Sequence, residues 1–450
     1  MIELLGVAVY AAILWLATAY FARGYSETKE GFLTANRNIG LFAGALSIGA
    51  TWLWAPGLFV SATKAYTLGL PGLFWFCFGN ILCLGIFGYF AAKLREMTPN
   101  GFTLSEYIGN TVSRRVQKLY WIELGFLTIS AIGIQLLAGG ILLNAITGID
   151  PWIISSTMAV IAISYSLFSG LKGSIVTDWI QMIIIIGGCL ILVPWAISAG
   201  GGIDTVVKGA TGTILDWDVF VAFGVAATIG FIAGPFGDQM FYQRAYALKK
   251  SIIWPAFIGG ALLFAIVPLS MGTLGFMATG LGLEVNPQLA GFEVIKEVLP
   301  VWAIYIFLFA IMSGLLSTCD SAMCAVSSLA TTDWFPNHED PIKVSRLGMI
   351  ALATLGLILA NLPGLQVVHL FLFHTVFRST TLLPTVQAIL YKDVNEAYMF
   401  WGLVTSFVIG FPLFLYGFMF GGGGAMIALG AILTVGASGG ITWYGRKNPY

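Results

Sequence analysis

Apolar residues dominate the chain in long blocks, and short polar segments separate these blocks. A helix that crosses a membrane needs about 20 mainly apolar residues, because the hydrocarbon layer is about 30 Å thick. By that rule the pattern predicts thirteen spans. They lie at 4–22, 41–65, 70–94, 119–145, 152–170, 174–199, 217–242, 252–279, 300–332, 343–362, 365–391, 395–419 and 423–444.

The composition agrees with this pattern. Of the 450 residues, 58% are hydrophobic and 9% are charged, and the formal net charge is zero. A soluble domain carries about 25% charged residues. We therefore predict an all-α polytopic protein whose surroundings are the lipid bilayer. A balanced charge gives no support for nucleic-acid binding, and we find no sign of an obligate protein partner. The chain shows no nucleophile–base pairing or metal-ligand motif, so we do not expect an enzyme.

The basic residues gather on one side of the predicted membrane. Cytoplasmic loops are enriched in Lys and Arg, so this side is expected to be cytoplasmic. The N-terminus would then be extracytoplasmic and the C-terminus cytoplasmic, in a cell membrane. The loops on the other side receive Lys64, Lys208 and Lys296, and Arg378 lies inside the eleventh span. The seventeen residues on the cytoplasmic side are Arg23, Lys29, Arg37, Lys93, Arg95, Arg114, Arg115, Lys118, Lys172, Arg244, Lys249, Lys250, Lys343, Arg346, Lys392, Arg446 and Lys447.

Two spans contain residues that interrupt a helix. The second span holds Pro56 within Ala50–Gly57, and the seventh holds Pro235 within Gly230–Gln239. Unwound backbone at membrane depth is tolerated where it is buried or lines a cavity. The two breaks occupy corresponding positions in two five-helix units, which is typical of an inverted-repeat transporter. We expect an N-terminal helix and loop at 1–35, repeats at 36–200 and 201–392, and two extra helices at 393–450.

A polar cluster lies inside the ninth span. Ser317, Thr318, Asp320 and Ser321 follow one another where apolar side chains are expected. Polar groups at this depth are costly, so by default they mark a path for an ion or a substrate. Hydroxyl oxygens suit Na⁺. The alternative is that these hydroxyls bond to their own helical turn or join two helices.

Two smaller features concern the membrane surface. Thr103-Leu104-Ser105-Glu106 resembles a capping box and predicts a short interfacial helix. Lys118 and Glu123, at the start of the fourth span, are expected at the interface.

Several stretches resemble the sodium:solute symporter family, which has the leucine-transporter fold preceded by one extra helix. Ser169-Gly170-Leu171-Lys172, Thr177-Asp178 and Gln181 are similar to the family's Gly-Gly-Leu-Lys…Thr-Asp…Gln stretch. The ninth span, from Leu316-Ser317-Thr318 to Thr332-Asp333, resembles its sodium-site helix. Within the family, Trp52-Leu53-Trp54-Ala55-Pro56 looks most like the urea and polyamine symporters of fungi and plants.

The resemblance implies ion sites. The hydroxyls of Ser317 and Thr318, with the carbonyls of Gly314, Gly49 and Trp52, would bind sodium as the coupling ion. A possible second cation would lie at Asp178, Asp320 and Ser321. Alternatively, Asp178 and Asp320 are partners for Lys172 or for backbone donors.

The resemblance also implies a urea-like small-molecule substrate. Urea needs aromatic faces and hydrogen-bonding groups, because an unpaired amide in a dry pocket costs about 1–3 kcal/mol. The candidates are Trp52, Trp54, Gln135, Phe231, Asp238, Gln239 and His374, together with His369 and Arg378. We expect sodium-coupled symport of urea by alternating access. Another substrate (amino acid, polyamine, sugar or carboxylate), proton coupling, a passive channel and a sensory membrane domain are the alternatives.

Overall fold

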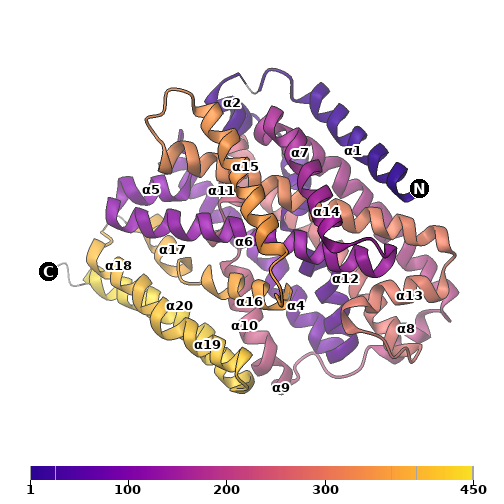
Figure 1. Ribbon diagram of the computed structural model, residues 1–450. Coiled ribbons are helices and arrows are strands. Elements are labelled where there is room, and N and C mark those ends of the chain that lie inside the picture. Colours follow the sequence, from indigo (N-terminus) through magenta and orange to yellow (C-terminus); the bar gives the residue numbers. More distant parts are fainter. Residues whose placement is uncertain (1, 26, 366, 392, 448–450) are drawn as a thin grey trace.

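The structure is a computed structural model that describes residues 2–25, 27–365, 367–391 and 393–447. Its regular elements in these residues are helices (Figure 1). Eight of the described helices are long and apolar enough to cross a membrane, by length and composition. The chain is therefore an all-α polytopic membrane protein, as the hydrophobic pattern predicts.

The first half of the chain forms seven helices. They are α1 (Ile2–Phe21), α2 (Lys29–Thr34), α3 (Leu41–Trp52), α4 (Ala55–Met97), α5 (Leu104–Thr111), α6 (Arg114–Thr147) and α7 (Pro151–Ala199). The Thr103 hydroxyl accepts a hydrogen bond from the Glu106 backbone, and the Glu106 carboxylate accepts one from Phe102 N, so the predicted cap of α5 is confirmed.

The second half begins at the short helix α8 and ends in three helices that lie together at one side of the molecule (Figure 1). Short π-helical turns follow α9 at Phe220–Gly224, α14 at Ala330–Trp334 and α18 at Ser406–Gly410. The helices are α8 (Ile203–Gly209), α9 (Trp217–Val219), α10 (Val225–Ala233), α11 (Gln239–Ala247), α12 (Ile253–Gly280), α13 (Ala290–Val298), α14 (Val301–Leu329), α15 (Pro341–Ala360), α16 (Val367–Phe377), α17 (Leu382–Leu390), α18 (Glu396–Thr405), α19 (Phe411–Met419) and α20 (Gly423–Lys447).

Helix α7 contains two predicted spans, and α4 contains the third predicted span with the end of the second. Helices α4 and α7 have 43 and 49 residues, and at 1.5 Å per residue each would be about twice as long as the hydrocarbon layer is thick. Each is kinked at a glycine with positive φ, Gly69 (φ 66°, ψ −148°) and Gly170 (φ 56°, ψ −147°). All thirteen predicted spans fall on helices, while the number of membrane crossings stays a prediction.

The two predicted helix breaks are confirmed, and a third was missed. Leu53 and Trp54 separate α3 from α4. Residues 234–238, with a 3₁₀ turn at Pro235–Gly237, separate α10 from α11. The third break, at 378–381, divides the predicted eleventh span into α16 and α17. It contains no glycine or proline, so the residue types at these positions do not predict a break.

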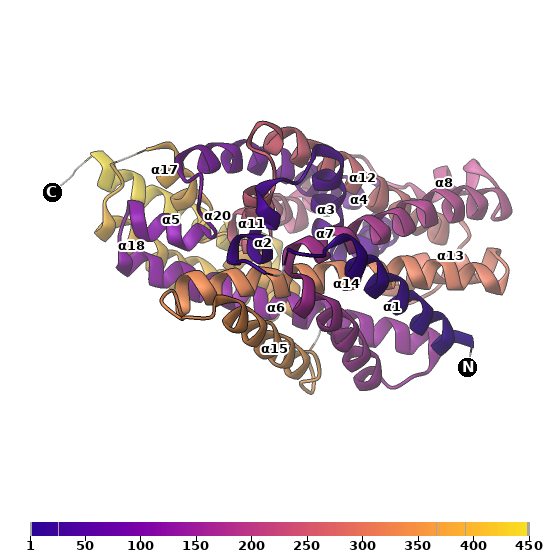
Figure 2. The ribbon, with the colours of Figure 1, turned by 90° about the horizontal axis from the view of Figure 1, so that it is seen from above.

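Helix α14 is the centre of the fold. Every residue from Ala310 to Leu329 is buried, so this part of the helix has no exposed face. It packs against α6, α7 and α15, while α12 covers α3 and α4. Figure 2 shows α14 crossing the middle of the molecule, with α1 beside α7.

The link between α2 and α3 contains an unusual turn. Ala35, Asn36 and Arg37 have φ values of 47°, 53° and 53°, which are rare for residues other than glycine. Beyond this turn, Ile39 pairs with the end of α11: its N–H donates to Ala247 O (3.0 Å), and its carbonyl accepts from Lys249 N (3.1 Å). The N-terminal end of α3 is thereby held against the C-terminal end of α11.

The kink at Gly170 gives a stability prediction. A side chain there would require a strained backbone and would meet the carbonyl and ring of Phe32. We expect Gly170→Ala to lower stability by about 1–3 kcal/mol, measured as a fall in melting temperature of the detergent-solubilised protein.

The matched control is Gly187→Ala. Gly187 lies in the same helix, and a Cβ there would meet nothing within 4 Å. Equal melting temperatures for the two variants would contradict the importance of the kink.

Candidate functional site

Two aspartates and one arginine lie together in the interior. Asp178 on α7 accepts hydrogen bonds from Ser47 Oγ (2.6 Å) and Ser317 Oγ (2.5 Å). It also accepts one from Arg244 Nη2 on α11 (3.0 Å). Asp178 is fully buried and Arg244 is 2% exposed. The ion pair therefore joins α7 to α11, and hydroxyls of α3 and α14 complete it.

Asp320 on α14 is surrounded by hydroxyl groups. Its carboxylate accepts from Tyr165 OH (2.6 Å), Ser174 Oγ (2.7 Å) and Thr177 Oγ1 (2.9 Å). Ser174 and Ser321 also accept from Arg244 Nη2, at 3.3 and 2.5 Å. Asp178, Arg244 and Asp320 thus belong to one hydrogen-bonded network, named here the interior charge network.

In the structure Asp178 pairs with Arg244 and not with Lys172, which was the alternative partner. Lys172 lies beside the rings of Tyr25 and Trp179, at 5.2 and 5.9 Å, and Arg244 takes the place at Asp178. The prediction that Arg244 is one of the basic residues at the membrane surface is therefore wrong, because Arg244 is buried. With both carboxylates ionised, the network carries one net negative charge.

The predicted sodium ligands lie close to this network. Ser317 and Thr318 are fully buried on α14. Ser317 Oγ donates to Asp178, whereas Thr318 Oγ1 makes only a long contact with Gly314 O (3.4 Å). Hydroxyl and carbonyl oxygens are ligands that fit Na⁺, as in other transporters with broken helices.

At the break that follows α3, the Leu53 carbonyl lies close to the predicted sodium ligand Gly314. A Cβ placed on Gly314 would lie 3.6 Å from Leu53 O, so this carbonyl faces α14. Trp52 O already accepts from Trp54 N (2.9 Å). A Cβ on Gly49 would meet Gly260 O and Met182, so Gly49 packs on α12 and α7. The carbonyl ligands at Gly49, Trp52 and Gly314 stay a prediction, and the structure adds Leu53 O as a further candidate.

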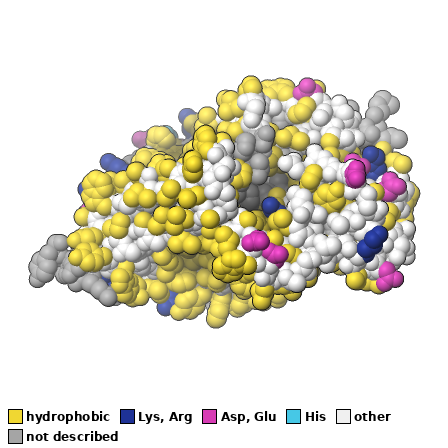
Figure 3. All heavy atoms as spheres, turned by 90° about the horizontal axis from the view of Figure 1, so that it is seen from below, with side chains coloured by type: hydrophobic (Ala, Val, Ile, Leu, Met, Phe, Trp, Pro, Cys, Tyr) yellow, Lys and Arg dark blue, Asp and Glu magenta, His cyan; other side chains and the backbone are white. Residues whose placement is uncertain are grey.

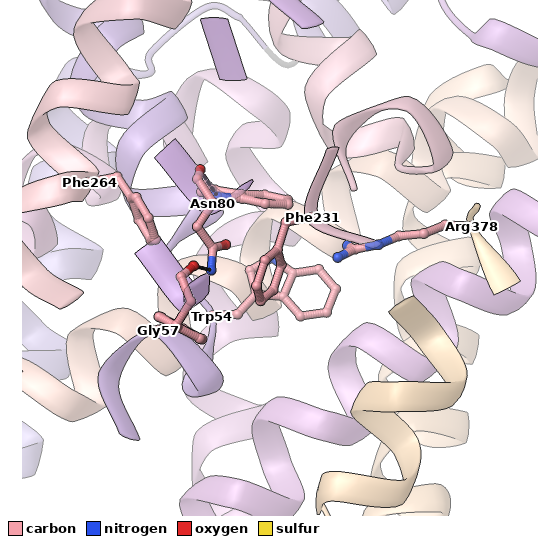
Figure 4. Close-up of a pocket in the computed structure, with 8 residues that line it drawn as sticks. Trp54, Gly57, Asn80, Phe231, Phe264 and Arg378 are labelled. Carbon is pink, nitrogen blue, oxygen red and sulfur yellow. Dashed lines mark hydrogen bonds between the residues drawn. The ribbon is translucent and has the colours of Figure 1, made fainter. Parts of the chain in front are cut away.

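A small cavity lies at the break between α3 and α4. It measures about 20 Å³ as the space open to the centre of a water molecule, and one water needs about 10–15 Å³ on that measure. Four predicted residues line it: Trp52, Trp54, Phe231 and Arg378. In Figure 4 the Arg378 guanidinium points toward Trp54 and Phe231. The residues that sequence reasoning missed are Gly57, Phe76, Asn80 and Phe264.

Two residues that line this cavity carry buried N–H groups without a hydrogen-bond partner among the described residues. Arg378 lies over the rings of Trp52 and Trp54, at 5.5 and 5.8 Å from its Cζ. Arg378 Nε and Trp54 Nε1 are buried and have no hydrogen-bond partner among the described residues. The Trp52 indole donates to Asn80 O (3.1 Å). The site thus offers unused N–H groups beside flat aromatic faces.

Two other predicted substrate residues lie behind or below the cavity. His374 Nδ1 is 2.7 Å from Ser130 Oγ, and its ring centroid is 4.7 Å from that of Trp54, so it supports Trp54 from behind. Asp238 accepts from Met240 N (2.9 Å) and so caps α11, while its Oδ2 has no hydrogen-bond partner among the described residues.

Gln135 and Gln239 are buried outside the set that lines the cavity. Gln135 lies on α6. Gln239 donates to Phe102 O (2.9 Å) and Ser328 Oγ (3.1 Å) and accepts from Leu104 N (3.2 Å), so it holds the segment before α5. The side chain of His369 lies outside the described part of the structure.

The position of Glu123 also differs from the predicted one. The sequence places it at the interface, but it is only 8% exposed. Its carboxylate accepts from Thr381 Oγ1 (3.0 Å) and Thr380 Oγ1 (3.3 Å). It therefore ties α6 to the third break, beside Arg378.

One end of the molecule is closed by hydrogen bonds. Asp333 accepts from Ser105 Oγ and from Gln117 Nε2 (3.0 Å). Arg37 donates to the carbonyls of Gly101 (3.0 Å), Asn100 (3.1 Å) and Tyr246 (3.4 Å). The segment that precedes α5 is thus fastened to α11 and to the ends of α2 and α14.

The opposite end holds a wide vestibule. Its volume is about 430 Å³ on the same measure. Phe231 lines both the vestibule and the small cavity, so it separates them.

These features define a class of protein. Helices broken at paired positions, a small polar cavity at the breaks and an ion-type cluster beside it are the arrangement of secondary transporters. The chain belongs to the sodium:solute symporter family, whose model matches residues 32–406. It is thus a member of a transporter family.

Known proteins resemble the chain in sequence and in fold. The probable urea active transporter 1 of Schizosaccharomyces pombe is 25% identical over 70% of the chain and 53% of its own length. The urea-proton symporter DUR3 of Oryza sativa subsp. japonica is 22% identical over 90% and 62%. The chain thus spans little more than half of these relatives. The solved structure of a Na⁺-coupled sialic acid symporter has a TM-score of 0.82 and 18% identity, over 99% of this chain and 98% of the other.

The interior charge network gives a second prediction. Arg244→Met would leave two buried carboxylates without their cation, and breaking a buried ion pair costs about 3–5 kcal/mol. We expect a marked fall in melting temperature. Adding Asp178→Asn should recover part of it, because the neutral amide no longer needs the guanidinium.

Lys296→Met is the control. Lys296 pairs with Glu293 at 3.2 Å on the surface, where an ion pair contributes less than about 1 kcal/mol. Strictly additive effects of the two interior substitutions would contradict the pairing.

Proposed function

We propose that the chain is a cation-coupled symporter that imports urea. The unpartnered donors of the cavity support this proposal most directly. A buried N–H without an acceptor costs about 1–3 kcal/mol, and the urea carbonyl oxygen would accept from Arg378 and Trp54. The flat urea molecule would lie against the tryptophan rings, with the Asn80 amide beside its N–H groups.

The same geometry argues against some other substrates. Arg378 is the charged residue among the described residues that line the cavity, so a polyamine would meet repulsion. A small carboxylate is the second candidate, because Arg378 would pair with it.

We infer that Na⁺ binds at Ser317 and Thr318, with the carbonyls of Gly314 and Leu53. The charge count of the network supports a second cation near Asp178, Asp320 and Ser321, because one negative charge is uncompensated. That cation would be Na⁺, or a proton on Asp320. The proton is the second candidate because one similar protein is named a urea-proton symporter.

Transport would proceed by alternating access, in which a four-helix bundle rocks against the remaining scaffold of the two repeats, 36–200 and 201–392. The vestibule would be extracytoplasmic, with the N-terminus on that side, and the end closed by Arg37 and Asp333 would be cytoplasmic. Cation binding would hold the α3–α4 break against α14 while urea fills the cavity. Each charge that enters down a membrane potential supplies about 2.3 kcal/mol per 100 mV.

Uptake of radiolabelled urea into proteoliposomes tests the substrate and the ion together. We expect accumulation with an inward Na⁺ gradient and none without a cation gradient. Arg378→Gln should reduce uptake at least tenfold, because a hydrogen bond from a charged group is worth about 1.5–3 kcal/mol.

Trp302→Phe, on the exposed start of α14, is the control for damage to the protein and should transport normally. Accumulation driven by a pH gradient alone would assign proton coupling. Na⁺-dependent uptake of a small carboxylate without urea uptake would mean that the carboxylate, and not urea, is the substrate. Downhill urea flux that depends on neither gradient would exclude symport.

The sodium site is tested by Thr318→Val, which keeps the shape of the side chain and removes its hydroxyl. The Na⁺ concentration for half-maximal uptake should rise at least tenfold, with maximal uptake changed less. Ser327→Ala is the control, because Ser327 lies on the same helix and bonds only within it, to Cys324 O (2.6 Å). An unchanged Na⁺ dependence in Thr318→Val would move the sodium site elsewhere.

A further inference from the structure

The vestibule is a second cavity with its own chemistry. Its described lining is mainly apolar and comes from α4, α6, α10, α16, α19 and α20. The rings of Phe59, Phe223, Phe414 and Phe418 contribute much of it. Figure 3 shows this face of the molecule hollowed, with hydrophobic side chains around the hollow and a basic side chain within it. A volume of about 430 Å³ falls in the range of sites for drug-sized molecules.

Lys64 is the charged residue among the described residues that line the vestibule. Its Nζ lies 4.4 Å from the centroid of the Phe223 ring. No acidic side chain of the described chain pairs with it: the ion pairs involve Arg37, Arg244, Lys296 and Arg446. A half-buried ammonium group in an apolar cavity therefore has a ring face as its neighbour but no counter-ion.

We propose that the vestibule is a binding site for an aromatic organic monoanion that arrives from the water-filled end. The carboxylate of such a molecule would pair with Lys64, and its aromatic body would lie against the phenylalanine rings. The apolar surroundings strengthen this ion pair, because they screen charges less than water does. A cation of the same shape would meet Lys64 as a like charge.

An occupant of this site would stand between the opening and the substrate cavity. Phe231 closes the small cavity on the side that faces the vestibule. A bound monoanion would therefore block the entry path without entering the site at Trp52 and Trp54. The proposal concerns this second cavity and does not depend on which solute is transported.

Direct binding tests it, with three probes of one shape: biphenyl-4-carboxylate, biphenyl-4-carboxamide and biphenyl-4-methylamine. The full chain is placed in nanodiscs of neutral phosphatidylcholine, and binding is measured by isothermal titration calorimetry. We expect saturable binding of the carboxylate, at least tenfold tighter than that of the neutral amide, and no saturable binding of the amine. Lys64→Met should abolish the tenfold preference, and Lys64→Arg should keep it.

Two controls separate the site from general effects. Lys208→Met removes an exposed lysine of α8, outside the vestibule lining, and should bind the carboxylate as the parent does. Ile141→Trp should weaken binding of the carboxylate and the amide alike, because Ile141 lines the vestibule and is 43% exposed. The proposal is overturned if Lys64→Met binds the carboxylate unchanged, if the three probes bind equally, or if they only partition into lipid without saturation.

Discussion

Two aspartates and one arginine inside an apolar protein must keep their polar partners, and much of this structure follows from that constraint. Asp178, Asp320 and Arg244 come from three helices, and Ser47 of a fourth helix bonds to both Asp178 and Arg244. In a medium of low polarity, separating such groups is very costly. The helices that carry them are therefore held in register around α14, whose inner part has no exposed face. The Ser317 hydroxyl, which donates to Asp178, also belongs to the proposed ion site, so the proposed ion binding and the helix packing would share this contact.

The breaks in the helices bring the substrate cavity next to this network. The α3–α4 break presents Leu53 O toward α14 and the rings of Trp52 and Trp54 toward the cavity. Arg378 reaches the cavity because its helix ends there, at the third break. One short unwound segment thus touches both the ion-type cluster and the cavity. This shared segment is a physical route by which occupation of one site can alter the other.

The hydrophobic pattern predicted the helices, two of the three breaks, the cap of α5 and the buried cluster on α14. Each of these has a local cause, such as a proline, a capping residue or a hydroxyl among apolar residues. The positions of Arg244, Glu123 and Leu53 were not predicted. An arginine near the end of a predicted span is expected at the membrane surface. The contact between Arg244 and Asp178 arises from the packing of α11 and α7, which the local sequence does not specify. Which carbonyl leaves the helix at a break depends on backbone angles that residue types do not specify.

The left-handed turn at Ala35-Asn36-Arg37 has an energetic consequence. Non-glycine residues in this conformation cost about 1–3 kcal/mol each, and three stand in a row. The hydrogen bonds from Arg37 to three carbonyls hold the turn in place. In the proposed transport cycle this end of the molecule would open, and loss of these bonds would let the backbone relax and return part of its strain. That returned strain would offset part of the cost of breaking the hydrogen bonds from Arg37.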